Sequence, residues 1–296
     1  MKVQKSLCSI LFLLALLFLL AACQNQASAP SPSPSPSAAS SSKWFTEPRE
    51  LDSGDGYESS AYYLHNEITD RHIYSVETRP TGLAEGEKVP VVIYVHGGSG
   101  EATTFQGIYT ALAQDRIAAF SFECCGGNRS GAKSEGSKLF SSHYTSRITD
   151  LETVLEKVKT LDYVDTDRIF LFGESYGGLV VSLSAIDHPE IAGLILLSTG
   201  LQEDMMGDNG HETYIADYDK ADPMESIKAY EGDVICFNGD QDDALEAGRA
   251  QIEIYNQRES GTAVFYEMAD SEHSYSAFSP AAKAEVIDTM RDFILQ

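Results

Sequence analysis

Residues 169–178 read IFLFGESYGG, an apolar stretch that passes into a glycine-rich turn. The first four residues form an apolar run of the kind that fills a buried strand, and LVVSLSAI at 179–186 has a helical pattern. Between the two lies Gly-x-Ser-x-Gly, centred on Ser175. On so tight a turn the serine hydroxyl projects above the sheet, and the glycines let the helix pack close to the strand. The stretch therefore predicts a nucleophilic serine at the carboxyl end of a buried strand.

Four further apolar runs surround this stretch, at residues 89–95, 117–122, 191–197 and 234–237. They do not alternate apolar with polar residues, which is typical of strands buried on both faces of a parallel sheet. Helical spacing appears between the runs, as at 148–161, and residues 281–295 predict a closing amphipathic helix. Residues 57–78 predict an initial antiparallel hairpin, because Tyr, Ile and Val alternate there with polar residues. We therefore predict an α/β protein with a doubly wound, mostly parallel sheet.

Reactive side chains follow the ends of these predicted strands, where ligands bind in such a sheet. The run at 234–237 is followed by three carboxylates, Asp240, Asp242 and Asp243. His273 lies in a loop before the closing helix and, of the seven histidines, is the one that follows both the serine and these acids. The chain order serine, acid, histidine predicts a catalytic triad, whose acid stays open among the three aspartates.

A glycine-rich loop, HGGSG at residues 96–100, follows the run at 89–95. Such a loop supplies one half of an oxyanion hole, and the residue after the nucleophile supplies the other. Glycine suits this place because the backbone can approach a substrate oxygen without a Cβ. We expect the two donors to be the backbone N–H groups of Gly98 and Tyr176.

From about residue 89 to its C-terminus, the chain resembles the α/β-hydrolase superfamily and, within it, bacterial cinnamoyl (feruloyl) esterase-like hydrolases. The matching motifs are HGG at 96–98, GESYGG at 173–178, Gly239-x-x-Asp242, His273, the stretch from CGGNRS at 125–130 through EGS at 135–137, and LDYVD at 161–165. The resemblance implies Ser175 as nucleophile, His273 as general base and Asp242 as the acid that orients the histidine. Asp240 and Asp243 remain alternatives for the acid.

One departure keeps a second activity open. Tyr176 stands where glutamine is frequent in that esterase group. A Ser-Tyr-Gly-Gly elbow is also similar to prolyl-oligopeptidase-type peptidases. Because elbow and oxyanion hole serve esters and amides alike, a peptidase or amidase with the same triad is the first alternative.

The first 42 residues have the composition of an export signal and a spacer. Two lysines precede an uncharged Leu- and Phe-rich stretch, the layout of a secretory signal peptide. LAAC at 20–23 resembles a bacterial lipobox, and more than one acyl chain on Cys23, such as palmitate, would anchor the protein stably. The uncharged Ser/Pro/Ala-rich segment that follows predicts a disordered spacer. We expect a signal peptide at 1–22, lipidated Cys23 and a linker at 23–42, and an α/β-hydrolase domain at 43–296 on the extracytoplasmic face of a bacterial membrane.

An insertion at about residues 200–230 is rich in Asp, Glu, Met and Tyr. The resemblance implies a small lid at this position. The Met and Tyr side chains of this insertion could line a pocket for an acyl or aryl group. Ordinary packing would account for them equally well. The residues that could line such a pocket are Met205, Met206, His211, Tyr214 and Tyr218.

Three cysteines lie beside predicted strands. Cys124 and Cys125 follow the run at 117–122, and Cys236 lies within the run at 234–237. A disulfide from either of the first two to Cys236, or three buried free thiols, would fit an exported protein.

The composition narrows the classes of function. With 45 acidic and 21 basic residues, the formal net charge is −24. Such a chain repels nucleic acid. Closely spaced His or Cys pairs typical of metal sites are lacking, and the predicted chemistry requires no cofactor. We interpret the chain as an exported, lipid-anchored serine esterase for small-molecule esters; a ligand-binding lipoprotein without catalysis is the second alternative. The oligomeric state stays open.

Overall fold

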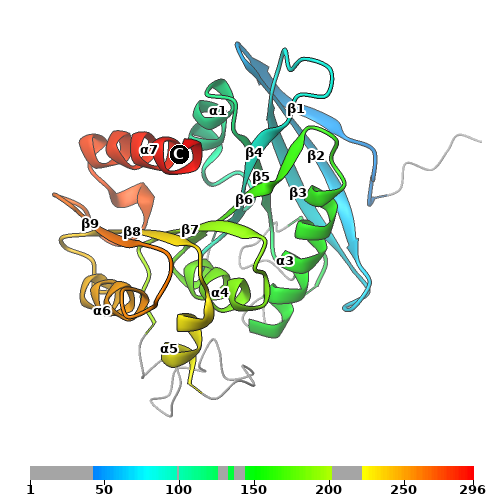
Figure 1. Cartoon of the computed structure of the whole chain (residues 1–296). Coiled ribbons are helices and arrows are strands. Elements are labelled where there is room, and N and C mark those ends of the chain that lie inside the picture. Colours follow the sequence, from blue (N-terminus) through cyan, green and yellow to red (C-terminus); the bar gives the residue numbers. More distant parts are fainter. Residues whose placement is uncertain (1–42, 99, 126–132, 137–143, 202–221) are drawn as a thin grey trace, which may run out of the picture. The chain divides into compact units, whose positions relative to one another are not determined.

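The computed structural model describes residues 43–98, 100–125, 133–136, 144–201 and 222–296, all within one unit, Ser42–Gln296. Within these residues, nine strands form one sheet (Figure 1). In chain order the strands are β1 (Arg49–Gly54), β2 (Tyr57–Asn66), β3 (Arg71–Pro80), β4 (Val89–Val95), β5 (Ala118–Phe122), β6 (Val164–Glu174), β7 (Ile191–Leu197), β8 (Asp233–Gly239) and β9 (Ala263–Met268).

Strand order combines an antiparallel edge with a parallel body. Across the sheet the order is β1-β2-β3-β5-β4-β6-β7-β8-β9. The pairs from β1 to β5 are antiparallel, and all pairs from β5 to β9 are parallel. The predicted doubly wound, mostly parallel sheet is therefore confirmed, and the hairpin expected at 57–78 is the β2–β3 pair.

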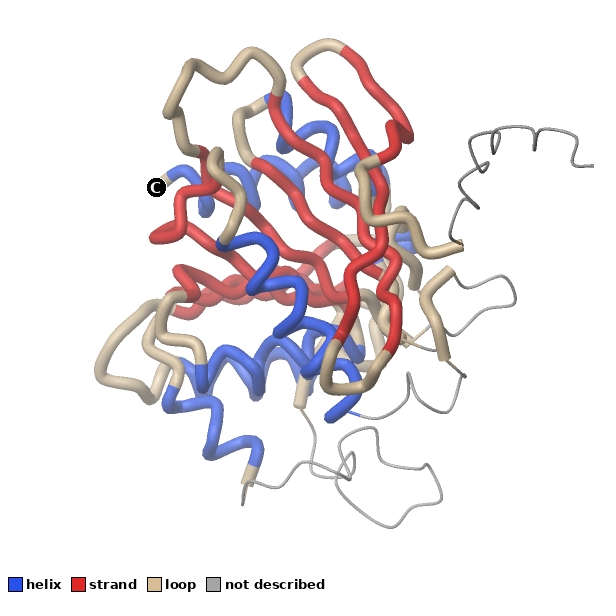
Figure 2. Tube along the Cα trace, turned by 90° about the vertical axis from the view of Figure 1, so that its right-hand side faces the viewer, coloured by secondary structure: helices blue, strands red, loops and turns tan. Residues whose placement is uncertain are grey.

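Helices cover both faces of the sheet (Figures 1 and 2). They are α1 (Gln106–Gln114), α3 (Tyr144–Lys159), α4 (Tyr176–Ser184), α5 (Pro223–Ser226), α6 (Leu245–Tyr255) and α7 (Pro280–Leu295), with 3₁₀ turns η1 (Ala185–Asp187), η3 (Ile227–Ala229) and η4 (Tyr275–Ala277). Apolar residues of α3, α4 and α6 join one core cluster, and those of α1 and α7 join the cluster on the opposite face. This double cover explains the continuous apolar runs, because both faces of the parallel strands are buried.

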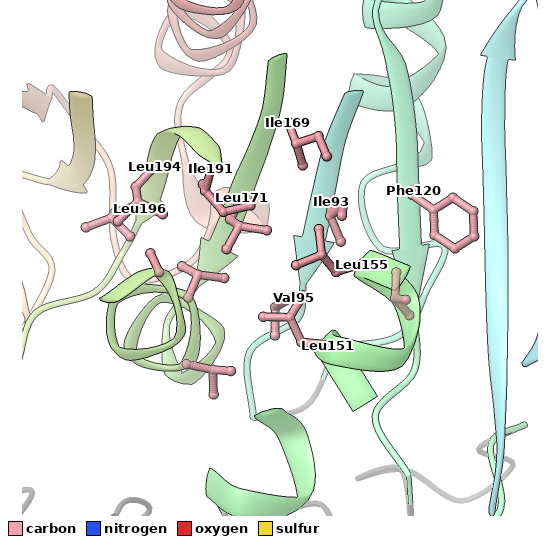
Figure 3. Packing of buried hydrophobic residues seen from close by; sticks show 14 of the residues in the cluster. Ile93, Val95, Phe120, Leu151, Leu155, Ile169, Leu171, Ile191, Leu194 and Leu196 are labelled. Atoms are coloured by element: carbon pink, nitrogen blue, oxygen red, sulfur yellow. The ribbon is translucent and has the colours of Figure 1, made fainter. Parts of the chain in front are cut away.

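The two core clusters divide each central strand by alternation. In β4, Ile93 and Val95 pack on the α3 and α4 side, whereas Tyr94 packs on the α1 and α7 side. Figure 3 shows Ile93 and Val95 beside Leu151 and Leu155, which come from α3. Packing on both faces fixes the position of each strand along its own axis. It therefore also fixes the position of the loop at the carboxyl end of the strand.

Two sequence expectations fall partly or wholly outside the described residues. The predicted signal peptide, Cys23 and the linker lie in residues 1–42, and the lid candidates lie in residues 202–221. The end of the expected lid is described as α5 and η3, where Ile227 is fully buried in the core. In the part of the chain that the structure describes, no helix has the length and apolar character needed to cross a bilayer.

Candidate active site

Ser175 lies on the turn between β6 and α4 in a strained backbone conformation. Its φ is 51° and its ψ −121°, a region that residues with a side chain rarely adopt. The turn is held on both sides, because Ser175 N–H donates to Leu197 O at 2.9 Å and Thr199 Oγ1 donates to Ser175 O at 2.8 Å. The hydroxyl is thereby presented at the carboxyl end of the sheet.

The glycines of GESYGG are required by the close approach of helix and strands. A Cβ on Gly177 would lie 1.9 Å from Val95 O, and one on Gly173 would lie 2.5 Å from Gly177 O. A Cβ on Gly178 would meet the side chain of Thr199 at 2.5 Å. Larger residues at these places would push α4 away from the sheet and move the serine.

Three side chains from separate loops form a continuous hydrogen-bonded relay. Ser175 Oγ and His273 Nε2 are 3.0 Å apart, and His273 Nδ1 lies 2.8 Å from Asp242 Oδ1. An ionised Asp242 can only accept, so Nδ1 of His273 carries the proton and Nε2 is free to accept from the serine hydroxyl. The structure thus brings together the three residues that the sequence singled out.

Asp242 and His273 differ in burial, and their mutual hydrogen bond shifts the pKa of each. The Asp242 side chain is fully buried, whereas that of His273 is 47% exposed. Burial disfavours the charge of Asp242, but hydrogen bonds from His273 and from the Ala244 N–H outweigh it and hold the pKa of Asp242 below its usual value. The hydrogen bond to Asp242 in turn raises the pKa of His273. Both shifts favour an ionised acid next to a histidine that accepts a proton readily.

The other two candidate acids form no hydrogen bond to His273 in the structure. Asp240 accepts the N–H groups of Asp270 and Ser271, each at 3.1 Å, and so fastens the loop that leads to His273. Asp243 is exposed. Of the three carboxylates, Asp242 is the one whose bond to His273 the structure contains.

The predicted oxyanion loop lies directly against the elbow. A Cβ on Gly97 would come within 3.3 Å of the Ser175 Cβ. Cys124 N–H donates to His96 Nε2 at 3.0 Å, so the ring proton is on Nδ1, which donates to Gly97 O at 2.6 Å. In a trans peptide the C=O and N–H point in opposite directions, so Gly98 N–H is directed away from the His96 ring.

Arg147, on α3, is a site residue that our sequence reasoning missed. It is fully buried, and its guanidinium donates to His96 O at 2.6 Å and to Gly97 O at 3.4 Å. The same group lies 4.3 Å from the centre of the Tyr176 ring. One buried cation therefore contacts both predicted halves of the oxyanion hole. The available signal was helical spacing, because Arg147 lies four residues before Leu151 on the apolar stripe of the helix.

The three cysteines that the structure describes are free thiols. Cys124, Cys125 and Cys236 are all buried and none forms a disulfide. Burial raises the pKa of Cys124 to about 12, and it also raises the pKa of the other two. A disulfide to Cys236 is excluded by the topology, because β4, β6 and β7 lie between β5 and β8. In the described part of the chain, no group of three or more His, Cys, Asp or Glu side chains could hold a metal ion.

Comparison with known proteins gives sequence matches over part of the chain and a broader structural likeness. Residues 86–216 match the family model Hydrolase_4, described as serine aminopeptidase, S33. The matched span contains the glycine-rich loop and the elbow, and it ends before Asp242 and His273. A dipeptidyl peptidase family member 2 from Caenorhabditis elegans is 27% identical over 112 residues, which is 36% of this chain and 14% of the peptidase's length.

Solved structures that are similar to this chain include several esterases. Est1E from Butyrivibrio proteoclasticus with bound ferulic acid has a TM-score of 0.62 and 20% identity, covering 80% of this chain and all of that one. Acetyl xylan esterase 1 from Thermoanaerobacterium has a TM-score of 0.61 and 16% identity, covering 83% and 87% of the two chains. A putative dienelactone hydrolase from Klebsiella pneumoniae has a TM-score of 0.63 and 15% identity, covering 81% and 99%. At these identities the likeness establishes a shared fold.

Proposed function

We propose that this chain, a serine hydrolase of the α/β-hydrolase superfamily, hydrolyses small carboxylic esters with Ser175, His273 and Asp242 as its catalytic triad. The observation that carries the proposal is the relay from Ser175 Oγ through His273 to the buried Asp242, with contacts of 3.0 Å and 2.8 Å. Each contact has the length of a normal hydrogen bond, so proton transfer needs no rearrangement of the three side chains.

Acylation begins with the serine hydroxyl. His273 Nε2 takes the proton of Ser175 as its oxygen attacks the ester carbonyl, and Asp242 stabilises the imidazolium that forms. The imidazolium then donates its proton to the departing alcohol, which leaves an acyl group on Ser175. Water attacks this acyl-enzyme with the same histidine as base, and the acid product is released.

The negative oxygen of each tetrahedral intermediate is assigned to the N–H groups of Gly98 and Tyr176. Support comes from the Gly97 carbonyl, which is engaged by Arg147 and His96, so that the N–H of the same peptide unit points away from them. One such donor lowers the barrier by about 3 kcal/mol in other hydrolases. The assignment gives each catalytic group a task and requires no metal or organic cofactor.

A substrate panel separates ester from amide hydrolysis. We expect Ser175-dependent turnover of short p-nitrophenyl esters and methyl ferulate, with aminoacyl p-nitroanilides as the amide arm and Ser175→Ala as the blank. Turnover that persists in Ser175→Ala contradicts the proposal. Absence of turnover on every substrate by a folded protein favours the ligand-binding alternative.

A peptidase remains the second candidate, and a specific observation favours it. The sequence matches described above, to a serine aminopeptidase family and to a dipeptidyl peptidase, concern enzymes named for peptide substrates. Faster turnover of the anilides than of the esters would move the assignment to this activity with the same three catalytic residues.

We further propose that the enzyme is held by lipid at Cys23 on the outer face of a bacterial membrane. The support is the LAAC sequence after an uncharged apolar stretch, followed by the Ser/Pro/Ala spacer. Expressed in bacteria with a radiolabelled fatty acid, the full chain is expected to carry label and to sediment with membranes. Cys23→Ser is expected to lose both, and equal labelling of the two proteins contradicts the anchor.

A further inference from the structure

Glu174, the residue before the serine in GESYGG, is a buried carboxylate without a role in the steps above. It is 5% exposed. Its Oε1 accepts from Ser274 Oγ at 2.6 Å and from Tyr275 N–H at 3.3 Å, and its Oε2 accepts from Tyr94 OH at 3.2 Å. Both carboxylate oxygens therefore serve as hydrogen-bond acceptors. Glu174 thereby connects the end of β6 to the segment that follows His273.

That segment is strained at the residue next to the histidine. Ser274 has φ 79° and ψ 143°, a conformation that belongs almost entirely to glycine. Such a backbone persists only where its surroundings hold it, and contacts to two distant segments help to do so here. Ser274 N–H donates to Ser198 Oγ at 2.9 Å, and the Ser274 hydroxyl donates to Glu174. Because Ser274 is joined directly to His273, the direction of this peptide sets where the imidazole points.

We propose that Glu174 is a positioning residue for the catalytic base: it fastens Ser274 and Tyr275 to the nucleophile strand and so holds His273 over Ser175. Asp242 fixes the ring through Nδ1, while Glu174 fixes the backbone from the other side. This inference rests on the proposed function, because it assigns Glu174 a part in the same reaction.

The same carboxylate also acts on the histidine through its charge. Asp242 and Asp243, from the loop after β8, and Glu174, from the end of β6, face His273, and all three raise its pKa. Asp242 contributes most, through its hydrogen bond. Asp243 is exposed and contributes charge alone, so it offers a matched control for the electrostatic part of the effect.

Three variants and one control separate the positioning effect of Glu174 from the effect of its charge. Glu174→Gln keeps an acceptor for Ser274 and Tyr275 and removes the charge. Ser274→Ala keeps the charge and removes the strongest tether. Glu174→Ala removes both, and Asp243→Asn removes only a distant charge. For each folded variant, kcat and KM are measured against pH, and circular dichroism and thermal melting establish that the variant folds.

If Glu174 holds His273 in place, loss of this support lowers kcat at the plateau of the pH profile. We expect Glu174→Ala and Ser274→Ala to lose about tenfold or more in kcat with KM changed less than about threefold, since misplacing a catalytic group costs rate. Their double variant is expected to lose less than the two single losses combined, because both act through one hydrogen bond. Asp243→Asn is expected to keep the plateau. Wild-type kcat in folded Ser274→Ala and Glu174→Gln, with an unmoved acid limb, overturns the inference even where Glu174→Ala does not fold.

The negative charge of Glu174 predicts in which direction the pH profile moves when the charge is removed. Removing a nearby negative charge lowers the pKa of His273, so the acid limb of kcat/KM moves to lower pH in Glu174→Gln and stays in place in Ser274→Ala. The His273 imidazole resonance, assigned by its loss in His273→Gln, reports this pKa by NMR without any turnover. If the wild-type protein hydrolyses nothing, the proposed function fails. A lower His273 pKa in Glu174→Gln than in the wild type would still support the effect of the Glu174 charge on His273, and an equal pKa would overturn that effect.

Discussion

Asp242 differs from Asp240 and Asp243 in the burial of its carboxylate and in its bond to His273. The three residues lie within four positions of the chain and are chemically alike, so composition and spacing left the triad acid open. The resemblance implied Asp242, and the geometry agrees, since its fully buried carboxylate lies 2.8 Å from His273 Nδ1. The three aspartates differ in the direction that each side chain takes from the turn. This direction could not be predicted from a single sequence.

The first prediction concerns this choice of acid. Asp242→Asn is expected to lower kcat by about 10⁴-fold, because an amide N–H facing Nδ1 favours the wrong imidazole tautomer. Asp240→Asn keeps one of the two oxygens that accept from the Asp270 and Ser271 N–H groups. It is expected to lose far less than Asp242→Asn, because Asp240 does not bond to His273. Initial rates on a short p-nitrophenyl ester decide the matter. The reverse order of the two variants contradicts the assignment.

The second prediction concerns pH. Hydrolysis requires neutral His273, and its pKa is raised above the ordinary value of 6.5, first by the bond to Asp242. The acid limb of kcat/KM is therefore expected to have its midpoint above pH 6.5. Asp242, whose pKa is lowered, stays ionised throughout this limb. The pH profile of kcat/KM reports the pKa of His273 in the free enzyme and so tests the direction of its shift. A midpoint below pH 6.5 is incompatible with the relay.

At the scale of elements, the strands that are buried on both faces could be predicted from the sequence. The runs that became β4, β5, β6, β7 and β8 are apolar because helices cover both faces of the sheet. β1 could not be predicted in the same way. All six of its residues are exposed, and its strand form comes from pairing with β2. The polar beginning of β6 also escaped notice, because the sequence signal was restricted to its buried part.

The elbow offers a prediction at this scale. Gly177→Ala places a Cβ 1.9 Å from Val95 O, so we expect a large loss of thermal stability or of folded protein. Gly107→Ala is the matched control, since a Cβ there meets nothing within 4 Å and alanine favours the α1 helix. Thermal melting compares the two. A Gly177→Ala protein as stable and active as Gly107→Ala contradicts the packing described for the elbow.

Helix α3 carries a further prediction through Arg147. Arg147→Met removes the donors to His96 O and Gly97 O, and we expect kcat to fall about tenfold or more while KM changes little. Arg168→Met, at a partly exposed ion pair with Asp165, is the control and is expected to keep wild-type kcat. Kinetics on folded protein distinguish them. Equal kcat in both variants shows that the oxyanion loop does not depend on the buried cation.

At the scale of the whole molecule, the site is a product of strand order. Ser175, Asp242 and His273 follow β6, β8 and β9, whose carboxyl ends lie along one edge because these strands are parallel. Chain order could therefore identify the serine and the histidine before any geometry was known. Glu174 and Arg147 could not be found in this way, since their roles depend on contacts between segments about 50 to 100 residues apart.

The most direct test of the central claim is a covalent one. Wild-type protein and Ser175→Ala are treated with a fluorophosphonate, which reacts with an activated serine, and the intact mass and the modified peptide are determined. We predict one adduct per chain, located on Ser175, absent from Ser175→Ala and formed much more slowly in His273→Gln. An unmodified wild-type protein, or an adduct that survives in Ser175→Ala, would contradict the account of Ser175 as a nucleophile activated by His273.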